Sequence, residues 1–297
     1  MNQNRFLINN ADGFGFTPGV NAGILETFKT GLVRSTSCTP NFGFLNEAGE
    51  TQRRFPDVSF GIHFNLSVGK PCSRPDAIRS LLNERDEFVG AELLRRIYRK
   101  EAKFDEMLIE LKAQASVLAD QGVSISHFDG HQNRHLWPTY FEACLAAAKH
   151  FNIKAVRSHR RALYTNFGGI KKAEQVEYYC KNPKRILTHL GGRMRTRKAE
   201  KNGFAAADRL ITPGYADDSH KTMGKFWRVL AETLPTGYSE VYCHPGYPDD
   251  LLRASASYVD QREDEVRTLT NPELAQIYKD EKINLITFWD LIKGRGL

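Results

Sequence analysis

The chain has 297 residues, of which 41% are hydrophobic and 26% are charged, and its formal net charge is +7. This balance is typical of a folded globular protein and excludes a disordered or low-complexity chain. No apolar run approaches the roughly 20 residues of a transmembrane helix, and the polar first residues do not resemble a signal peptide. Five scattered cysteines without CxxC spacing indicate reduced thiols, so we expect a cytoplasmic protein.

Strand-like and helix-like patterns alternate through the first half of the chain. The apolar run at residues 6–11 predicts a strand, and Pro18 occupies a favoured first position of a helix that we expect to end near Gly31. Further strands are predicted at residues 35–42, 58–66 and 125–129, and helices at residues 45–55, 104–121 and 139–151. Residues 69–103 are predicted to form an insertion with one or two helices.

The second half continues this pattern around a second predicted insertion at residues 161–203. Strands are predicted at residues 155–157, 239–243 and 284–288, and a helix is expected to end near Tyr278. Repeated strand–helix units predict a parallel sheet covered by helices. We therefore expect an α/β fold, a distorted TIM-like (β/α) barrel that forms a single domain over residues 1–297. No GxGxxG or GxxxxGK[ST] element supports nucleotide binding.

The positive charge is concentrated in the second insertion. Residues 161–201 contain eleven Lys or Arg against three Asp or Glu, so the rest of the chain is nearly neutral. Two interpretations stay open: a solvated mobile loop or lid, and a surface for an anionic partner, such as a membrane or a phosphorylated or lipid-linked substrate. Peripheral membrane contact through residues 161–203 belongs to the second interpretation. We expect no nucleic-acid partner, because no recognised nucleic-acid module surrounds the segment.

The densest group of chemically active residues lies at residues 127–135. Asp129, His131 and His135 fall within seven residues, and His127 comes just before them. They follow a predicted strand and precede a helix, which is where α/β folds place their chemistry. Neutral imidazoles there suit zinc, or another divalent ion if oxygen ligands complete the shell. The alternative is a polar loop whose histidines cap or pair.

Three other predicted strand ends carry residues of the same type, namely Asp12, His63 and His244. In a barrel these ends converge on one face, so residues far apart in the chain can form one site. Each has a simpler explanation: Asp12 could cap a turn or a helix, His63 could be a satisfied core histidine, and His244 could be a turn residue. These three explanations and the polar-loop alternative for residues 127–135 would all have to hold together, so we favour a shared site.

Several segments resemble a known family. Residues 10–21 (NADGFGFTPGVN) resemble the NADDFG opening of the YdjC-like carbohydrate deacetylases, which include chitooligosaccharide and hopanoid-biosynthesis-associated deacetylases. Four further segments resemble family motifs in the same order: GLVRSTS at 31–37, GIHFNL at 61–66, HFDGHQ at 127–132 and CHPG at 243–246. The resemblance spans nearly the whole chain. It implies a polysaccharide-deacetylase-like barrel that uses Mg²⁺ or Zn²⁺ to hydrolyse the N-acetyl group of an acetylated amino sugar or glycan.

The resemblance also implies roles for individual residues. His63 and His131 would bind the metal ion, Asp12 would be the general base and His244 the general acid. Ligand orientation or substrate contact would fall to Asp129, His127, His135, Arg157 and Tyr247. Aromatic candidates for stacking on a sugar are Trp137, Tyr215 and Tyr247, although aromatic side chains more often pack in a core. The substrate could be anionic or lipid-linked, and a homo-oligomer is compatible with the sequence.

Gly13 departs from the family pattern, which has a second aspartate as a metal ligand at this position. Without a side chain Gly13 cannot bind an ion, and the loss of a charged ligand should weaken metal binding. Three explanations are open: an inactivating substitution, Asp12 as the ligand with another base, or a non-catalytic relative that binds an acetylated glycan. A hydrolase of a non-sugar amide or ester on the same scaffold is a further alternative. Asn133 is a second departure, since close relatives often carry a histidine there.

Overall fold

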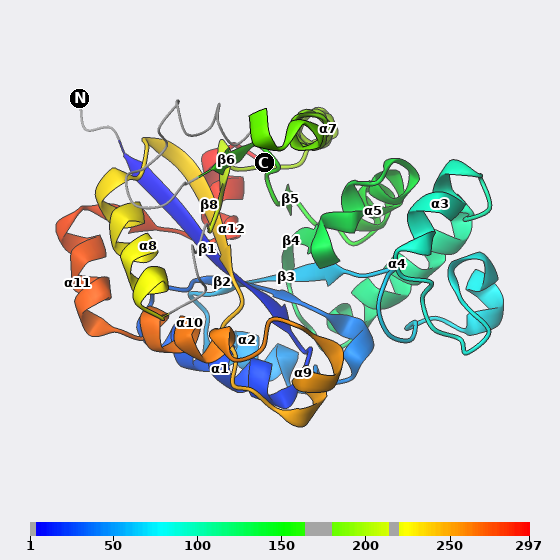
Figure 1. The fold of residues 1–297 in the computed structure, drawn as a ribbon, viewed down its shortest axis with the longest axis horizontal. Helices are drawn as coiled ribbons and strands as arrows, with labels where there is room; N and C mark the ends of the chain where they lie inside the picture. The colour runs from blue at the N-terminus through cyan, green and yellow to red at the C-terminus, as the bar shows by residue number, and fades with distance from the viewer. Residues whose placement is uncertain (1–3, 164–179, 214–219) are drawn as a thin grey trace.

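The computed structural model describes residues 4–163, 180–213 and 220–297. Its centre is a curled parallel sheet with helices packed around the outside (Figure 1). The described strands are β1 (Arg5–Phe14), β2 (Ser35–Cys38), β3 (Ser59–Phe64), β4 (Ile125–Gly130), β5 (Ala155–Val156), β6 (Arg161–Leu163), β7 (Arg209–Thr212), β8 (Gly237–Cys243) and β9 (Ile283–Leu285). Their order is β5-β4-β3-β2-β1-β8-β7-β6, and β9 pairs with β1. The parallel α/β architecture predicted from the sequence is confirmed.

The sheet curls toward closure without completing a ring of paired strands. The described residues of β5 and β6, the two ends of the strand order, do not pair with each other. A single bridge instead links Ala155 in β5 to Ala205, which precedes β7. The backbone N–H of Ala205 donates to Lys154 at 2.8 Å, and its carbonyl accepts from Val156 at 2.9 Å. The result is a distorted, half-closed barrel.

Helices connect the strands and cover the outside of the sheet. The α-helices are α1 (Pro18–Phe28), α2 (Ala48–Arg54), α3 (Glu92–Tyr98), α4 (Phe104–Ala119), α5 (Pro138–His150), α7 (Pro183–Lys201), α8 (His220–Thr233), α9 (Asp250–Ser255), α10 (Gln261–Leu269), α11 (Pro272–Asp280) and α12 (Phe288–Gly294). Short 3₁₀ helices are η1 (Pro40–Phe42), η2 (Pro75–Leu81) and η3 (His131–Leu136). Pro18 opens α1 as expected, with the Thr17 hydroxyl accepting from the Val20 N–H. No helix in these described ranges is both long and apolar enough to cross a bilayer.

The structure differs from the expectations in three local features. The strand expected at residues 35–42 ends at Cys38, because Pro40 has no N–H for a strand ladder and opens η1 instead. The short strands β6 and β7 were not predicted. The second insertion contains regular structure, since α7 runs for 19 residues, whereas residues 164–179 of that insertion lie outside the described chain.

Strand alternation separates the apolar core from the site. In β1, Leu7 and Ala11 belong to the main hydrophobic core, whereas Asn10 and Asp12 carry side chains that bond across strands. In β3 and β4 the same alternation sends Phe60, Ile62, Phe64 and Phe128 to that core. His63 and Asp129 lie on the other face, toward the inside of the curled sheet, where they contact each other. The strands thus bring polar groups from distant parts of the chain together.

Candidate active site

Three buried carboxylates converge on the guanidinium of Arg157. Nη1 and Nη2 of Arg157 donate to the two oxygens of Asp12, each at 2.6 Å. Nη2 also lies 2.8 Å from Asp129 Oδ2, and Nε donates to Glu240 Oε1 at 2.7 Å. None of the four residues is more than 5% exposed. Because an unpaired charge would be strongly unfavourable in such surroundings, the four groups depend on one another.

Burial and pairing decide the charges of this cluster. Burial lowers the pKa of Arg157, but Asp12, Asp129 and Glu240 outweigh burial and raise that pKa well above its usual value. Burial raises the pKa of Asp129, yet Arg157 and His63 together hold it well below its ordinary range. Glu240 behaves differently, because burial raises its pKa to about 7 in spite of Arg157. At neutral pH Arg157 and Asp129 are therefore both charged and form an ion pair, whereas Glu240 is near the midpoint of its titration.

Asp129 holds the imidazole of His63 at the end of β3. His63 Nδ1 lies 2.8 Å from Asp129 Oδ1, and the Ser37 hydroxyl donates to Asp129 Oδ2 at 2.9 Å. Burial lowers the pKa of His63, but the charge of Asp129 and its hydrogen bond outweigh burial and raise it. No described residue bonds to His63 Nε2. An imidazole with a carboxylate on one nitrogen and the other nitrogen open is typical of metal-binding histidines.

A cavity of about 250 Å³ opens at the carboxyl ends of these strands. Its lining comprises Asp12, Gly13, Phe16, Thr39, His63, Gly130, His131, Gln132, Asn133, Arg157, Tyr242, His244 and Arg262. A second cavity of about 540 Å³ shares six of these residues and extends to Tyr258 and Glu265. The shared lining makes the two cavities parts of one cleft. Its inner end is the charged cluster, and its outer end is wider.

Two further histidines flank the inner cavity. His131 begins η3 directly after β4, and its ring centroid is 5.7 Å from that of His63. Burial, followed by the charge of His63, lowers the pKa of His131 to about 3. His244 follows β8, and its Nε2 lies 4.0 Å from Asp12 Oδ2. Burial lowers the pKa of His244 to about 4, although Asp12 opposes this shift. Both imidazoles are therefore neutral at neutral pH, the form that binds metals and accepts protons.

Gly13 occupies an irregular point of β1 on the cavity wall. The register with β2 shifts between Asp12 and Phe14, and Gly13 has a φ of +104°, a conformation that residues with a side chain rarely adopt. A Cβ added here would meet Phe16 at 3.9 Å and Val20 at 4.0 Å, which is ordinary contact. The position therefore has space for a longer side chain, but its backbone conformation favours glycine.

One trio of possible metal-binding side chains is found in the described part of the chain. Donor atoms of Asp12, His63 and Asp129 lie within 4.8 Å of one another. Both oxygens of Asp129 already accept hydrogen bonds, from His63, Ser37 and Arg157, so Asp129 is better placed to orient His63 than to bind an ion itself. The imidazole of His131 lines the same cavity. This mixture of imidazole and carboxylate donors suits either zinc or magnesium.

Two histidines of the 127–135 segment do not line the cavity. His127 lies deeper inside the sheet, stacked on Phe288 with ring centroids 3.6 Å apart. Gly61 makes room for it, since a Cβ there would lie 2.3 Å from the imidazole. His135 is the buried residue of η3, and its Nε2 lies 3.0 Å from Nε2 of His159. Both residues are completely buried and have no described path to the cleft.

The aromatic residues at the cleft differ from those that the sequence suggested. Tyr247 is 38% exposed and lies outside the lining of both cavities. Trp137 precedes α5 and packs against the hydrophobic core, and Tyr215 lies outside the described residues. The cleft instead has Tyr242 and Tyr258 in its wall.

Sequence reasoning also missed two charged residues. Glu240 stands inside a strand, where a charge needs a buried partner, and this could have marked it. Nothing in the sequence marks Arg262 as part of the cleft wall, because it belongs to an ordinary charged helix, α10.

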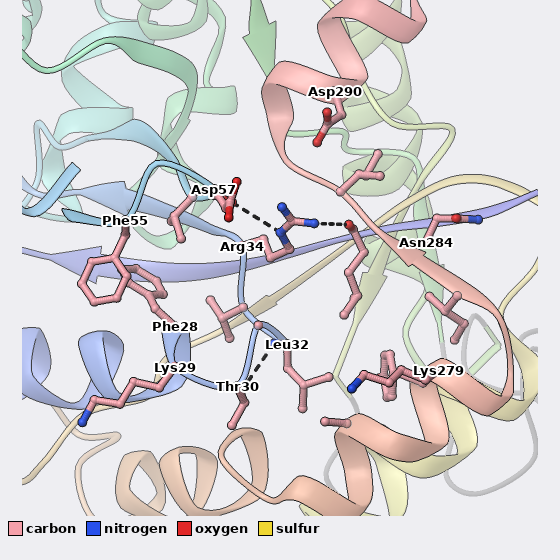
Figure 2. Close-up of a pocket in the computed structure, with 18 of the residues that line it drawn as sticks. Phe28, Lys29, Thr30, Leu32, Arg34, Phe55, Asp57, Lys279, Asn284 and Asp290 are labelled. Carbon is pink, nitrogen blue, oxygen red and sulfur yellow. Dashed lines mark hydrogen bonds between the residues drawn. The ribbon is translucent and has the colours of Figure 1, made fainter. Parts of the chain in front are cut away.

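A larger cavity, of about 870 Å³, lies at the opposite end of the sheet, near the start of β1 and β2 (Figure 2). There Arg34 donates to the backbone carbonyls of Asp57, at 3.3 Å, and Leu285, at 2.9 Å (Figure 2). No trio of possible metal ligands is found around it in the described residues. Active sites of barrels lie at the carboxyl ends of the strands, so cavity size alone does not locate the chemistry.

The chain is similar to known proteins along nearly its whole length. The sequence profile of the family described as YdjC-like protein matches residues 6–280. A carbohydrate deacetylase of Thermoanaerobacter pseudethanolicus is 31% identical over 97% of this chain and all of its own length. A carbohydrate deacetylase of Geobacillus stearothermophilus is 28% identical over 97% of this chain and 99% of its own. A crystal structure from Enterococcus faecalis V583, described as a putative cellobiose-phosphate cleavage protein, has the same fold, with a TM-score of 0.70 and 24% identity over 97% of this chain and 99% of its own.

Proposed function

The chain belongs to the YdjC-like protein family, and we propose on that premise that it is a carbohydrate deacetylase. The reaction would be metal-dependent hydrolysis of the N-acetyl group of an amino sugar or glycan, releasing acetate. Two relatives that match along nearly their whole length are named carbohydrate deacetylases, which supports the reaction class. The observation that carries the proposal is the meeting of Asp12, His63 and His244 at one cavity, with Asp12 held by Arg157.

The donors present fit a divalent ion. His63 would bind through Nε2, because Asp129 holds Nδ1. His131, on the same cavity wall, would be the second imidazole. Water would complete the shell, because both oxygens of Asp12 already accept hydrogen bonds from Arg157. A divalent ion bound there would polarise the acetamide carbonyl and lower the pKa of a bound water. Whether the ion is Mg²⁺ or Zn²⁺ depends on its oxygen ligands, and both fit two imidazoles.

Asp12 and His244 would move the protons. Asp12 takes a proton from the attacking water, and Arg157 keeps the carboxylate in the position that this transfer requires. The leaving amine needs a proton when the C–N bond breaks, and the low pKa of His244 means that it holds none beforehand. Asp12 Oδ2, at 4.0 Å from His244 Nε2, is a nearby source. The water proton would then pass through His244 to the amine, leaving acetate and a free amino sugar.

Gly13 bears on how well this chain performs the reaction. The family pattern has an aspartate there, so this site has one charged ligand fewer than the pattern implies. We propose weaker metal binding as the direct consequence, and reduced activity as the indirect one. A non-catalytic glycan-binding relative is the rival that Gly13 favours. The retained cluster of Asp12, Arg157 and His244 favours an enzyme.

The first test measures acetate release from a panel of N-acetylhexosamines and their oligomers, with Mg²⁺ or Zn²⁺ added. The chain is compared with its Asp12→Asn variant, which keeps the shape but not the base. Release that disappears in Asp12→Asn supports the proposal. Glycan binding with no release would favour the rival, and release only from non-sugar amides or esters would assign another substrate class.

The substrate is proposed to be anionic or lipid-linked, on the basis of α7. This helix packs against η3, the turn that begins with His131. Arg193 and Arg197 are exposed on it, whereas Arg195 is half-buried with its guanidinium 6.0 Å from the Phe141 ring centroid. Arg193→Gln/Arg197→Gln should raise KM for an anionic acetylated sugar and leave KM for a neutral one unchanged. Equal kinetics on both substrates would refute this preference.

A further inference from the structure

The helix α7 turns its largest apolar side chains toward solvent. Leu187, Leu190 and Met194 are 75%, 52% and 62% exposed, and Ile186 is 41% exposed. Four of the eleven large exposed apolar side chains in the described chain therefore lie on one helix. The residues that α7 buries against the protein are His189, Gly192, Thr196 and Ala199. This is the reverse of an ordinary surface helix, whose large apolar residues face the core.

The exposed apolar residues form one stripe bordered by positive charge. Positions 187, 190 and 194 have the i, i+3, i+7 spacing of a single helix face. By helical geometry, Lys184 and Lys198 flank this stripe on one side, and Arg193 and Arg197 on the other. In total α7 has seven basic residues and one acidic residue, Glu200, which pairs with Arg160. The outer face is therefore apolar and strongly positive at once.

The packing of α7 fixes this face in place. The Thr196 hydroxyl accepts a hydrogen bond from the His159 N–H at 2.9 Å. Gly192 allows the close approach, because a Cβ there would lie 3.0 Å from His159. Lys198 adds an ion pair of 2.6 Å to Glu142 on α5. Figure 1 shows α7 at the rim of the molecule, beside β6. The stripe is thus presented outward by a docked helix rather than by a free segment.

We propose that the outer face of α7 is a docking surface for an anionic lipid bilayer. Leu187, Leu190 and Met194 would enter the boundary between headgroups and acyl chains. Lys184, Arg193 and Arg197 would meet anionic headgroups, whereas Lys198 stays paired with Glu142. Charge complementarity selects this occupant, since a neutral protein partner would not use the positive flanks. A nucleic acid would use the charges but not three exposed apolar side chains. The inference does not depend on deacetylation.

The test is vesicle co-sedimentation of the full chain. Vesicles of phosphatidylcholine alone are compared with vesicles that also contain phosphatidylglycerol, at low and at physiological salt. We expect binding only to the anionic vesicles, and weaker binding as salt rises. Leu187→Gln/Met194→Gln should lower the partition coefficient about tenfold. The matched control is Tyr98→Gln/Ile109→Gln, which removes exposed apolar side chains from α3 and α4 and should bind like the unchanged chain.

Each other outcome contradicts the proposal. If the chain does not sediment with anionic vesicles at low salt, the α7 face does not bind an anionic bilayer. Equal binding to neutral and anionic vesicles would show that the basic side chains of α7 do not contribute to binding. If Arg193→Gln/Arg197→Gln abolished binding and Leu187→Gln/Met194→Gln did not, α7 would be a surface for a soluble polyanion. Acetate release from a soluble substrate, measured on the same samples, reports separately on the proposed function.

Discussion

Arg157 and Asp12 meet through two parallel hydrogen bonds of 2.6 Å, one from each terminal guanidinium nitrogen. Such a fork fixes the plane of the carboxylate as well as its charge. The guanidinium itself is held by Asp129 and Glu240. Asp12 is therefore presented to the cavity by a residue that has little freedom of its own.

This geometry predicts that Arg157→Lys impairs catalysis although it keeps the positive charge. A lysine ammonium cannot donate in parallel to both oxygens of Asp12 and also pair with Asp129 and Glu240. A misplaced base lowers kcat, by about 10²-fold, more than it changes KM. The measurement is steady-state acetate release, after circular dichroism has shown that the variant is folded.

The control for this variant is Arg160→Lys. Arg160 also makes a forked pair, with Glu200, but that pair is partly exposed and neither residue lines the cavity. Exposed pairs contribute little, so Arg160→Lys should leave acetate release unchanged. If Arg157→Lys is as active as Arg160→Lys, the fork has no part in presenting Asp12.

Gly13→Asp tests the position where the family pattern has a metal ligand. The cavity wall has room for the side chain, but the φ of +104° should lower stability by about 1–3 kcal/mol. The matched control is Gly13→Asn, which has the same backbone strain without the charge. We expect Gly13→Asp alone to bind Zn²⁺ or Mg²⁺ more tightly, by about tenfold or more in calorimetry, and to release acetate faster. Equal affinity in both variants would mean that residue 13 does not reach the ion.

The motif residues were predictable because they end parallel strands. Asp12 and His63 lie in the last residues of their strands, and His131 and His244 directly follow theirs. Because these carboxyl ends meet at one edge, order along the chain and strand direction were enough to group the four residues. His127 was grouped with them wrongly as a neighbour of the cavity. It shares the strand face of Asp129 but lies two residues deeper, and the depth of a cavity cannot be known from alternation.

The parts that sequence reasoning missed depend on tertiary contacts. The burial of Glu240 is explained only by its contact with Arg157, which lies 83 positions earlier in the chain. The regular structure of α7 was hidden because Gly191 and Gly192 lower helix propensity. Packing overrides that cost, since Gly192 is what lets the helix approach His159. Short strands such as β7 offer too few residues for a period to be recognised.

Glu240→Gln should stabilise the protein at alkaline pH. The folded pKa of Glu240 is raised from 4.5 to about 7, with burial as the main cause. The folded state then keeps a proton that the unfolded state releases, so stability is present at low pH and is lost as pH rises from about 4.5 to 7. Glutamine imitates the protonated acid and removes this loss of about 1.4 kcal/mol per pH unit. Urea unfolding at pH 5 and pH 8 measures it, with Glu84→Gln, a change at an exposed glutamate, as control. A smaller gain for Glu240→Gln at pH 8 than at pH 5 would contradict the shift.

His127→Phe should reduce the sensitivity of folding to acid. Burial lowers the pKa of His127 from 6.5 to about 3, and Asp129 only partly opposes this. The unfolded chain therefore binds a proton as pH falls below about 6.5, whereas the folded chain does not until about pH 3. Stability is lost across that window by about 1.4 kcal/mol per pH unit for this residue.

Phenylalanine at position 127 cannot titrate. It keeps a ring against Phe288 and removes an Nε2 that has no hydrogen-bond partner. Urea unfolding between pH 7 and 4 should show a shallower decline for His127→Phe than for His150→Gln, a change at an exposed histidine. If the free energy of unfolding declines in parallel for both variants, His127 takes up its proton in the folded state. The sheet around His127 would then have to open locally before the rest of the protein unfolds.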